Sequence, residues 1–509
     1  MTPDDASRRY PLVANDIAFV PGTSIGYLTA NGADAVFRVR YDDKGVIAEV
    51  GSSIAKFIDL APAALAAAQK GQTPIGLGIS NTGKGLLFAN NDVSRNMTVV
   101  DLNLQAIQGG AMAPTVFETA PARPMGSDEQ KIATGRRLFN TGLGRWSLKG
   151  QGWGACQSCH VDGLTDNVTW YFARGPRQSI SLDGTFSKKN PQDQRVMNWT
   201  AIFDEIADFE GNTRGVSGGV GAIVKQVGMP VSNADRINTA NVAGLGINAA
   251  GLNGSVAAVA DTSNPLGLPA NEKSVLEDWA SITRYVQIIR SPRRPTNLEV
   301  AKVTAGAQLF TQKNCQGCHG GEKWTLSKVF WTPSSSANAA LNAKSWSSIV
   351  NGTGFPGSLL PATTPANQLM RFASGNPAAL DQIQCVLRPV GTFGVAESGV
   401  GIAERRINMT STAQGNEPDG KGYNPPSLLG LQVGAPFLHG GNARTLEALL
   451  SDGFKLHHQA LAVNFLDPSD QNAPAQREQL VQFLLSIDDE QTVVPLPSLG
   501  ATGGSFCAP

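Results

Sequence analysis

Two five-residue runs constrain this chain more than any other feature: Cys156-Gln157-Ser158-Cys159-His160 and Cys315-Gln316-Gly317-Cys318-His319. Each is Cys-x-x-Cys-His, the attachment signature of c-type haem. In that chemistry the two thiols add to the vinyl groups of the porphyrin, and the adjacent imidazole coordinates the iron. We therefore predict two covalently bound haem c groups, held by the four cysteines, with the two histidines as metal ligands.

A structural zinc site and a thioredoxin-like dithiol are the alternatives for such cysteine pairs. Zinc would leave both adjacent histidines unexplained, and no βαβ pattern surrounds either pair. The residues favour haem.

Length and composition set broad limits. The 509 residues suggest about three domains. The chain has 41 basic and 41 acidic residues and so a net charge of zero, which does not suggest a protein that binds nucleic acid. No run approaches the roughly 18 consecutive apolar residues of a membrane span.

The cellular location is predicted from the haem motifs. The first residues, Met1-Thr2-Pro3-Asp4-Asp5, lack the basic and apolar regions of a signal peptide. Attachment of c-type haem takes place outside the bacterial cytoplasm, so we expect a processed or truncated chain of a protein that is periplasmic or secreted. Cys385 and Cys507 remain once the haem thiols are counted. They form either a disulfide, which suits an oxidising compartment, or two unpaired buried thiols.

Residues 1–120 are predicted to be β-rich. The run Gly-Tyr-Leu-Thr-Ala-Asn at 26–31, followed by a strand at 36–39, is echoed by Gly-Leu-Leu-Phe-Ala-Asn at 85–90 and a strand at 97–101. The echo resembles blades of a YVTN-type β-propeller, but a ring needs about four to eight blades. Further blades upstream, a decayed β appendage, or a small β-sandwich cap with accidental similarity are the open alternatives.

Helical patterns begin after the proline-containing link at 120–124. Ser127-Asp128-Glu129-Gln130 predicts a helix start, and Gly135-Arg136-Arg137-Leu138-Phe139 precedes the first motif. The related Gly306-Ala307-Gln308-Leu309-Phe310 precedes the second motif, on a helix expected to start near Thr296. A helix whose aromatic packs on the haem, followed by Cys-x-x-Cys-His, is the layout of small cytochromes c. We predict a mainly α fold with two cytochrome c-like haem domains after the β-rich region.

The expected boundaries follow from these patterns. The first haem domain covers residues 125–295, the second covers 296–492, and 493–509 form an extended tail. Apolar spacing predicts amphipathic helices over 272–290 and 475–487.

Only three further histidines exist: His439, His457 and His458. A second imidazole ligand must come from this stretch, which most easily serves the second motif. We predict that His319 and either His457 or His458 make a bis-His haem, which is coordinatively closed and suited to electron transfer. The alternative for the adjacent pair is two solvated side chains.

The haem of the first motif then has His160 and either an open sixth position or a weak ligand. Met197, Met229 or another methionine are the candidates for that ligand. An open iron permits peroxide or dioxygen chemistry. One closed haem that feeds one open haem indicates an enzyme.

Over roughly residues 125–490 the chain resembles the bacterial di-haem cytochrome c peroxidase superfamily, which includes MauG and the rubber oxygenases. The matching segments are 135–139, 174–186, and a C-terminal block that runs from Pro426-Ser427-Leu428-Leu429-Gly430 through Ala435-Pro436-Phe437-Leu438-His439-Gly440-Gly441 to Thr445-Leu446-Glu447. This block is similar to the family's "PSLRN…APYxHDG…TLEE" segment.

The resemblance implies roles for four further residues. A Trp lies between the haems in that family and relays electrons, and Trp199 matches it; the alternative is an ordinary core Trp. The family's peroxidases handle protons with a distal Glu and Gln. Here Glu205 or Glu210 would be the acid, and Arg214 would polarise bound oxygen; the alternative is a helix with carboxylates on its wet face.

The chain departs from the family at one ligand position. The family's Met or Tyr ligand falls at Gly453, which cannot ligate. This favours His457 or His458, as in the rubber oxygenases, whose second haem is bis-His. His439 is expected to hydrogen-bond a haem propionate or the backbone.

The resemblance also implies a Ca²⁺ site that uses backbone carbonyls before His439, where Gly434 and Pro436 stand. The segment 331–416 is expected to be an insertion that shapes access.

The leading hypothesis is an extracytoplasmic, peroxidase-like di-haem oxidoreductase. Electrons pass from the bis-His haem through Trp199 to the open haem of His160, with peroxide as the small-molecule oxidant. A dioxygenase of the rubber-oxygenase type, with Phe203, Ile206 and Phe209 as an apolar distal wall, is the alternative enzyme. A non-enzymatic electron-transfer cytochrome subunit is the alternative of another class. We expect a redox protein as electron donor or acceptor.

Overall fold

The computed structural model describes part of the 509-residue chain. The described residues are 9–62, 64–81, 83, 85–143, 154–172, 175–191, 193–195, 197, 199, 206–209, 275–327, 388, 390–391 and 423–497. They belong to two compact units. Among the described residues, the first unit takes those within 9–158 and 275–285, and the second takes those within 159–209 and 286–497.

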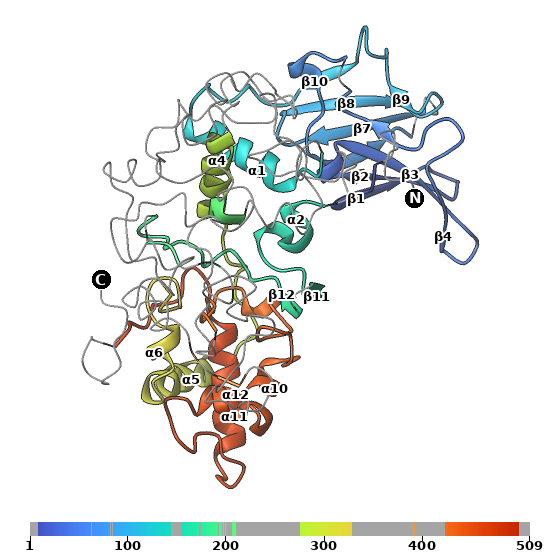
Figure 1. Ribbon diagram of the computed structural model, residues 1–509. Helices are drawn as coiled ribbons and strands as arrows, with labels where there is room; N and C mark the ends of the chain where they lie inside the picture. Colours follow the sequence, from blue (N-terminus) through green and yellow to red (C-terminus); the bar gives the residue numbers. More distant parts are fainter. Residues whose placement is uncertain are drawn as a thin grey trace. The chain divides into compact units, whose positions relative to one another are not determined.

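Two antiparallel sheets form the β part of the first unit (Figure 1). The first sheet has the order β1-β2-β3-β4, with β5 paired to β3, and the second has the order β10-β8-β7-β6, with β9 paired to β8. The strands are β1 (Ala14–Phe19), β2 (Ile25–Ala30), β3 (Ala35–Tyr41), β4 (Ile47–Val50), β5 (Ile58–Asp59), β6 (Pro74–Ile79), β7 (Leu86–Asn91), β8 (Asn96–Asp101), β9 (Ala106–Ile107) and β10 (Val116–Glu118). Two 3-10 turns, η1 (Asn31–Ala33) and η2 (Ala67–Gln69), lie between strands.

The two sheets pack face to face around an apolar core. Tyr27 and Val36 of the first sheet meet Leu87, Ala89 and Val100 of the second. The strand–turn–strand pattern expected at 26–39 and at 85–101 is an antiparallel hairpin in both places. Two sheets do not show a ring, so the propeller remains a prediction.

Helix α1 (Asp128–Asn140) in the same unit begins where the sequence predicts, because the Ser127 side chain accepts a hydrogen bond from the Gln130 backbone. It crosses α4 (Val275–Ile288), the helix expected over 272–290. A Cβ on Gly135 would lie 1.9 Å from the Ser281 carbonyl oxygen, so the two backbones touch. Beside this crossing the rings of Phe139 and Tyr285 meet edge to face, with centroids 5.3 Å apart.

The second unit repeats this arrangement. Helix α5 (Val300–Gln312) crosses α12 (Ala473–Leu485), and the two lie side by side in Figure 1. A Cβ on Gly306 would lie 2.1 Å from the Gln479 carbonyl oxygen. Phe310 and Phe483 meet next to it, with centroids 5.2 Å apart. Glycine and an aromatic four residues later therefore place a helix crossing ahead of each haem motif.

Short elements complete the described chain. They are α2 (Cys156–Cys159), η5 (Val161–Gly163), β11 (Thr169–Phe172), β12 (Gly175–Gln178), η6 (Ile206–Phe209), α6 (Gln316–His319), η15 (Leu431–Val433), α10 (Leu446–Leu449), η16 (Asp452–Phe454) and α11 (Lys455–His458). Since the described ranges hold both sheets and helices and leave long stretches out, the mainly α class and the domain boundaries stay predictions.

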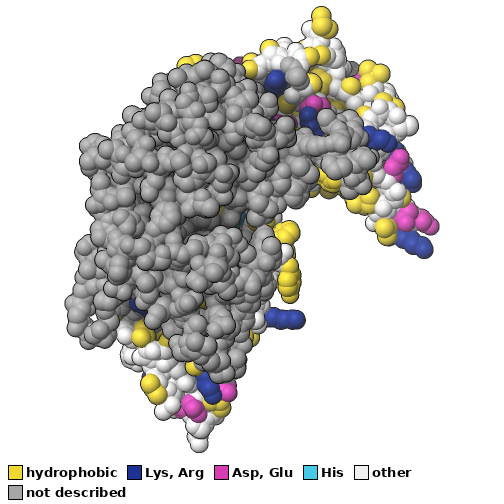
Figure 2. Space-filling view, viewed as in Figure 1, with side chains coloured by type: hydrophobic (Ala, Val, Ile, Leu, Met, Phe, Trp, Pro, Cys, Tyr) yellow, Lys and Arg dark blue, Asp and Glu magenta, His cyan; other side chains and the backbone are white. Residues whose placement is uncertain are grey.

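The surface carries mixed charge. Figure 2 shows acidic and basic side chains together near the end of the β3–β4 hairpin, where the turn reads Asp42-Asp43-Lys44. Within the described ranges, no helix combines the length and the hydropathy that crossing a bilayer requires.

Candidate haem site

The second Cys-x-x-Cys-His motif stands on one helical turn that follows α5. The Cys315 backbone donates to the Phe310 carbonyl, and the His319 backbone donates to the Cys315 carbonyl, which closes the turn α6. The imidazole Nδ1 of His319 lies 3.2 Å from the Pro426 carbonyl oxygen. A hydrogen on Nδ1 would bond to this carbonyl and leave the Nε2 lone pair for a metal, the arrangement common to ligating histidines.

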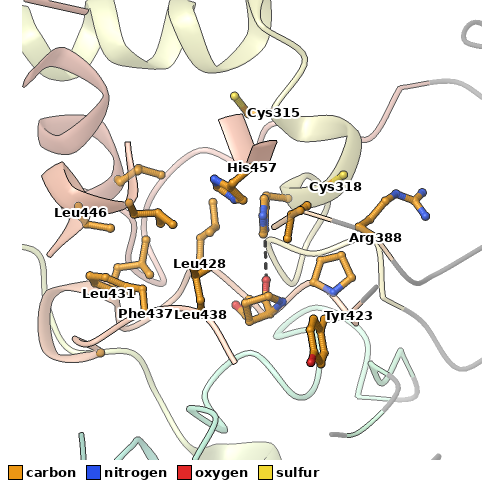
Figure 3. Close-up of a pocket in the computed structure, with 18 of the residues that line it drawn as sticks. Cys315, Cys318, Arg388, Tyr423, Leu428, Leu431, Phe437, Leu438, Leu446 and His457 are labelled. Carbon is orange, nitrogen blue, oxygen red and sulfur yellow. Dashed lines mark hydrogen bonds between the residues drawn. The ribbon is translucent and has the colours of Figure 1, made fainter. Parts of the chain in front are cut away.

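His457, on α11 and labelled in Figure 3, lines the same cavity as His319. The two imidazole centroids are 6.2 Å apart, and their planes make an angle of 57°. The adjacent His458 is turned differently: its ring meets the edge of Phe465 with centroids 6.5 Å apart. The sequence left His457 and His458 as equal alternatives, and the structure directs His457 at His319.

The cavity is mostly apolar. In Figure 3, Cys315 lies above His457 and Cys318 lies to its right, while aliphatic side chains such as Leu446, Leu428 and Leu431 lie below and to the left. Its apolar wall includes Leu428, Leu431, Phe437, Leu438, Leu446, Leu449, Leu450, Leu461, Phe465, Leu480 and Leu484. Such a wall suits the flat hydrocarbon face of a porphyrin.

Burial keeps the two facing imidazoles neutral. Loss of solvation lowers the pKa of His319 to about 4 and that of His457 to about 3, where nearby His319 also contributes. Neutral imidazoles carry the lone pair that a metal requires. Burial also raises the pKa of the Cys315 thiol to about 12, so the thiol is not ionised at neutral pH.

The side chains around the second motif fit a haem. All four motif cysteines and all five histidines are described, yet no three His, Cys, Asp or Glu side chains converge as a zinc site would need within the described residues. Two thiols at the rim, two facing imidazoles and an apolar slot between them fit a covalent haem instead.

An aromatic cluster forms one end of the cavity. Tyr423 stacks on His439 at 4.4 Å between centroids, and Trp199 meets the same imidazole edge to face at 6.1 Å. The Trp199 indole Nε1 donates to the Gln178 carbonyl at 2.9 Å. Trp199, His439 and Tyr423 thus line the same cavity as His319 and His457.

The first motif is also a single helical turn, α2. The His160 Nδ1 lies 3.3 Å from the Leu164 carbonyl oxygen, which repeats the contact of His319 with a backbone carbonyl. Burial lowers the pKa of His160 and raises that of Cys156 to about 11. Both motif histidines therefore have Nδ1 at a carbonyl.

Several of the remaining predicted site residues lie outside the described part of the chain. Glu205, Glu210 and Arg214 lie outside the described residues, as do Met229, Phe203, Cys385 and Cys507. Met197 is buried. Gly434 and Pro436, expected near a Ca²⁺ site, line the cavity, and the Ca²⁺ site stays a prediction.

Arg388, Tyr423 and Pro426 are cavity residues that the sequence did not indicate as parts of the site. Arg388 and Tyr423 exchange two backbone hydrogen bonds, and the Arg388 guanidinium bonds to the Cys318 thiol. The proline pair Pro425-Pro426 could have indicated that the Pro426 carbonyl is held in an extended stretch of backbone. The partner of that carbonyl, His319, lies 107 residues away in sequence, so no local pattern links the two.

Comparison with known proteins adds distant likenesses. No protein-family model and no curated protein matches the chain. Among solved structures, a MauG-like protein associated with microbial copper homeostasis is 15% identical, with 72% of this chain and 90% of that chain covered and a TM-score of 0.35. Hydrazine synthase from Kuenenia stuttgartiensis is 16% identical, with 72% and 89% covered and a TM-score of 0.32. At these TM-scores the likeness carries no argument about the site, whose chemistry rests on its own residues.

Proposed function

We propose that this chain is an extracytoplasmic di-haem c-type oxidoreductase whose second motif holds a bis-His, electron-transferring haem. The separation of the His319 and His457 rings, 6.2 Å, carries the proposal. A metal–imidazole bond is about 2 Å, and a ring centre lies about 1 Å beyond the nitrogen, so two imidazoles on one metal have centres about 6 Å apart. When bound, the haem supplies a one-electron iron couple.

The chain's own residues have separate tasks at this site. The Pro426 carbonyl fixes the orientation of His319, and His457 occupies the opposite position, so no small molecule has a place there. The leucine-rich wall excludes water and lowers the local dielectric constant. Arg388, which lines the cavity, offers a positive charge to the haem carboxylates.

We propose that the iron of the first motif is the reactive one. Of the five histidines, His457 faces His319, while His439 and His458 pack against Tyr423 and Phe465. With His457 assigned to the second motif, the proposal gives the reactive role to the haem that Cys156, Cys159 and His160 would hold. That haem would supply the chemistry by which peroxide takes up two electrons and two protons and yields two molecules of water.

Trp199 is the proposed route for the electrons, because its indole lines the cavity of the second motif. Glu205, Glu210 and Arg214 are the proposed proton-handling and polarising residues. One observation favours a different function: Met197 is buried, and a thioether bound opposite His160 would make the chain a pure electron carrier.

An EPR spectrum of the oxidised protein, with and without peroxide, tests the proposal. We expect one low-spin bis-His signal and one high-spin signal, and only the high-spin signal should change with peroxide. Two low-spin signals that peroxide leaves unchanged would establish the carrier. A high-spin signal that responds to dioxygen after reduction but not to peroxide would establish the dioxygenase alternative.

A further inference from the structure

One tight turn, Leu182-Asp183-Gly184-Thr185, contacts the surroundings of both motif histidines. The Thr185 backbone N–H donates to the Leu182 carbonyl at 3.0 Å, which closes the turn. Its last three residues are buried. The turn, His160 and His319 all belong to the second unit, so their contacts lie within one compact body.

The first residue of the turn holds the backbone that orients His160. The Leu182 backbone N–H donates to the Gly163 carbonyl at 2.9 Å. Gly163 stands directly before Leu164, whose carbonyl oxygen lies 3.3 Å from the His160 Nδ1. The same imidazole also bonds to the backbone of Ile180, two residues before the turn. The chain that enters the turn therefore runs along His160 and fixes the carbonyls around its ring.

The middle of the turn packs against the segment that orients His319. A Cβ on Gly184 would lie 2.1 Å from the Ser427 Oγ and 2.2 Å from the Ser427 Cβ. Ser427 directly follows Pro426, whose carbonyl oxygen lies 3.2 Å from the His319 Nδ1. Since a Cβ has no room at Gly184, the backbone of the turn rests directly on the Ser427 side chain.

A second contact repeats this relationship in the opposite sense. A Cβ on Gly430 would lie 2.9 Å from the Asp183 Oδ2, so here the side chain belongs to the turn and the glycine to its neighbour. Asp183 is itself held, because the Ser181 hydroxyl donates to its Oδ1 at 2.8 Å and the Lys188 ammonium donates to its carbonyl at 3.1 Å. Two glycines thus bring the turn and the segment from Ser427 to Gly430 into contact at two points.

We propose that Leu182–Gly184 is a positioning segment shared by both haem sites. The inference rests on the proposed function, in which His160 and His319 each ligate a haem. A hydrogen bond from Nδ1 fixes the orientation of a ligating imidazole and increases its strength as an electron donor. Displacement of this segment would disturb the carbonyls at both imidazoles. Both irons would then have weaker donors, and both midpoint potentials should rise.

Gly184→Ala tests the proposal in the full haem-loaded chain. The added methyl group must displace Ser427, and with it the Pro426 carbonyl, or must displace the turn itself. We expect both EPR signals of the oxidised protein to shift and both midpoint potentials to rise. Gly78→Ala in β6 is the matched control, because a Cβ on Gly78 meets open space, and its spectrum should equal that of the wild type. Haem content and far-UV circular dichroism check that each variant is loaded and folded.

Ser427→Gly approaches the same contact from the other side. It removes the two atoms that the new methyl group would meet, and the next nearest atom, the Lys323 carbonyl oxygen, is at an ordinary 3.5 Å. Ser427→Gly alone should shift both signals, because the turn loses the side chain on which it rests. The double variant with Gly184→Ala should move both signals back toward those of the wild type. This comparison holds even where Gly184→Ala alone does not fold.

The outcomes separate the inference from the proposed function. Wild-type protein without a low-spin bis-His signal would contradict the proposed function, and this inference with it. With that signal present, wild-type spectra in both Gly184→Ala and Ser427→Gly would overturn the positioning role and leave the function intact. A shift confined to one haem would also overturn it, because the turn would then hold only one of the two histidines.

Discussion

Gly306 on α5 and Gln479 on α12 are in backbone contact: a Cβ on Gly306 would lie 2.1 Å from the Gln479 carbonyl oxygen and 2.7 Å from the Phe483 Cβ. The first unit has the same relationship between Gly135 and Ser281. In both places the glycine allows a helix to cross another directly ahead of a cysteine pair.

Substitution of Gly306 by Ala should therefore destabilise the second unit. In an exposed helix the change would stabilise by about 1 kcal/mol through helix propensity. Here the methyl group must displace the backbone of α12, and we expect a net loss of about 1–3 kcal/mol in the free energy of unfolding. Urea unfolding followed by haem absorption measures it. Gln308→Ala, at an exposed position of α5, is the control and should have little effect. Unchanged or increased stability of Gly306→Ala would contradict the close crossing.

The orientation of the adjacent histidines leads to a second prediction. His457→Ala should abolish the low-spin bis-His EPR signal, because His457 is the imidazole that faces His319. His458→Ala is the matched control and should retain that signal, since its ring packs on Phe465. His457→Met should restore a low-spin haem with a higher midpoint potential, as thioether ligation does in cytochromes c. Loss of the signal in His458→Ala alone would assign the ligand to His458.

Much of the helical framework followed from local patterns. Ser127 as N-cap predicted the start of α1, and apolar spacing predicted α4 and α12. Boundaries were less accurate. Helix α12 begins at Ala473 rather than near 475, because Pro474 is favoured in the first turn, where no backbone N–H partner is needed. Helix α5 begins at Val300 rather than near Thr296, where the chain forms a turn instead.

Of the candidate site, the sequence predicted only the residues of the two motifs and a short list of further histidines. Cys-x-x-Cys-His predicted the thiols and one imidazole, and the scarcity of histidine restricted the predicted second imidazole to two neighbours. Adjacent residues on a helical turn point about 100° apart, so the choice of His457 depends on how η16 and α11 are placed by tertiary packing. The stacking of Tyr423 on His439 likewise joins residues whose contact no local pattern specifies.

The third prediction concerns a buried ion pair in the first unit. Asp34, in the turn between β2 and β3, pairs with Arg137 on α1, and both side chains are buried. Burial raises the pKa of Asp34, and the Arg137 charge opposes this rise. Asp34→Asn tolerates the left-handed backbone at this position but leaves a buried guanidinium without a counter-charge. We expect a loss of about 3–5 kcal/mol.

The neighbouring Arg136 supplies the control for that measurement. It pairs with Asp92 at 2.7 Å, but its side chain is 41% exposed. Arg136→Ala should cost less than about 1 kcal/mol, as exposed pairs do. Denaturant unfolding followed by tryptophan fluorescence and far-UV circular dichroism compares the two variants. Equal costs would mean that the Asp34–Arg137 pair does not anchor α1 to the sheets.

Trp199→Phe tests the proposed electron route. The substitution removes the indole that lines the cavity and meets His439, together with its hydrogen bond to the Gln178 carbonyl. We expect both haems to remain attached and inter-haem electron transfer to slow by about tenfold, equivalent to about 1.4 kcal/mol in the barrier. Stopped-flow absorption after partial reduction measures the rate. Trp170→Phe is the control: Trp170 is 40% exposed and its indole bonds to Asp166, so its loss should leave the rate unchanged. If both variants transfer electrons at the wild-type rate, Trp199 is a packing residue of the cavity wall and the electrons take another path.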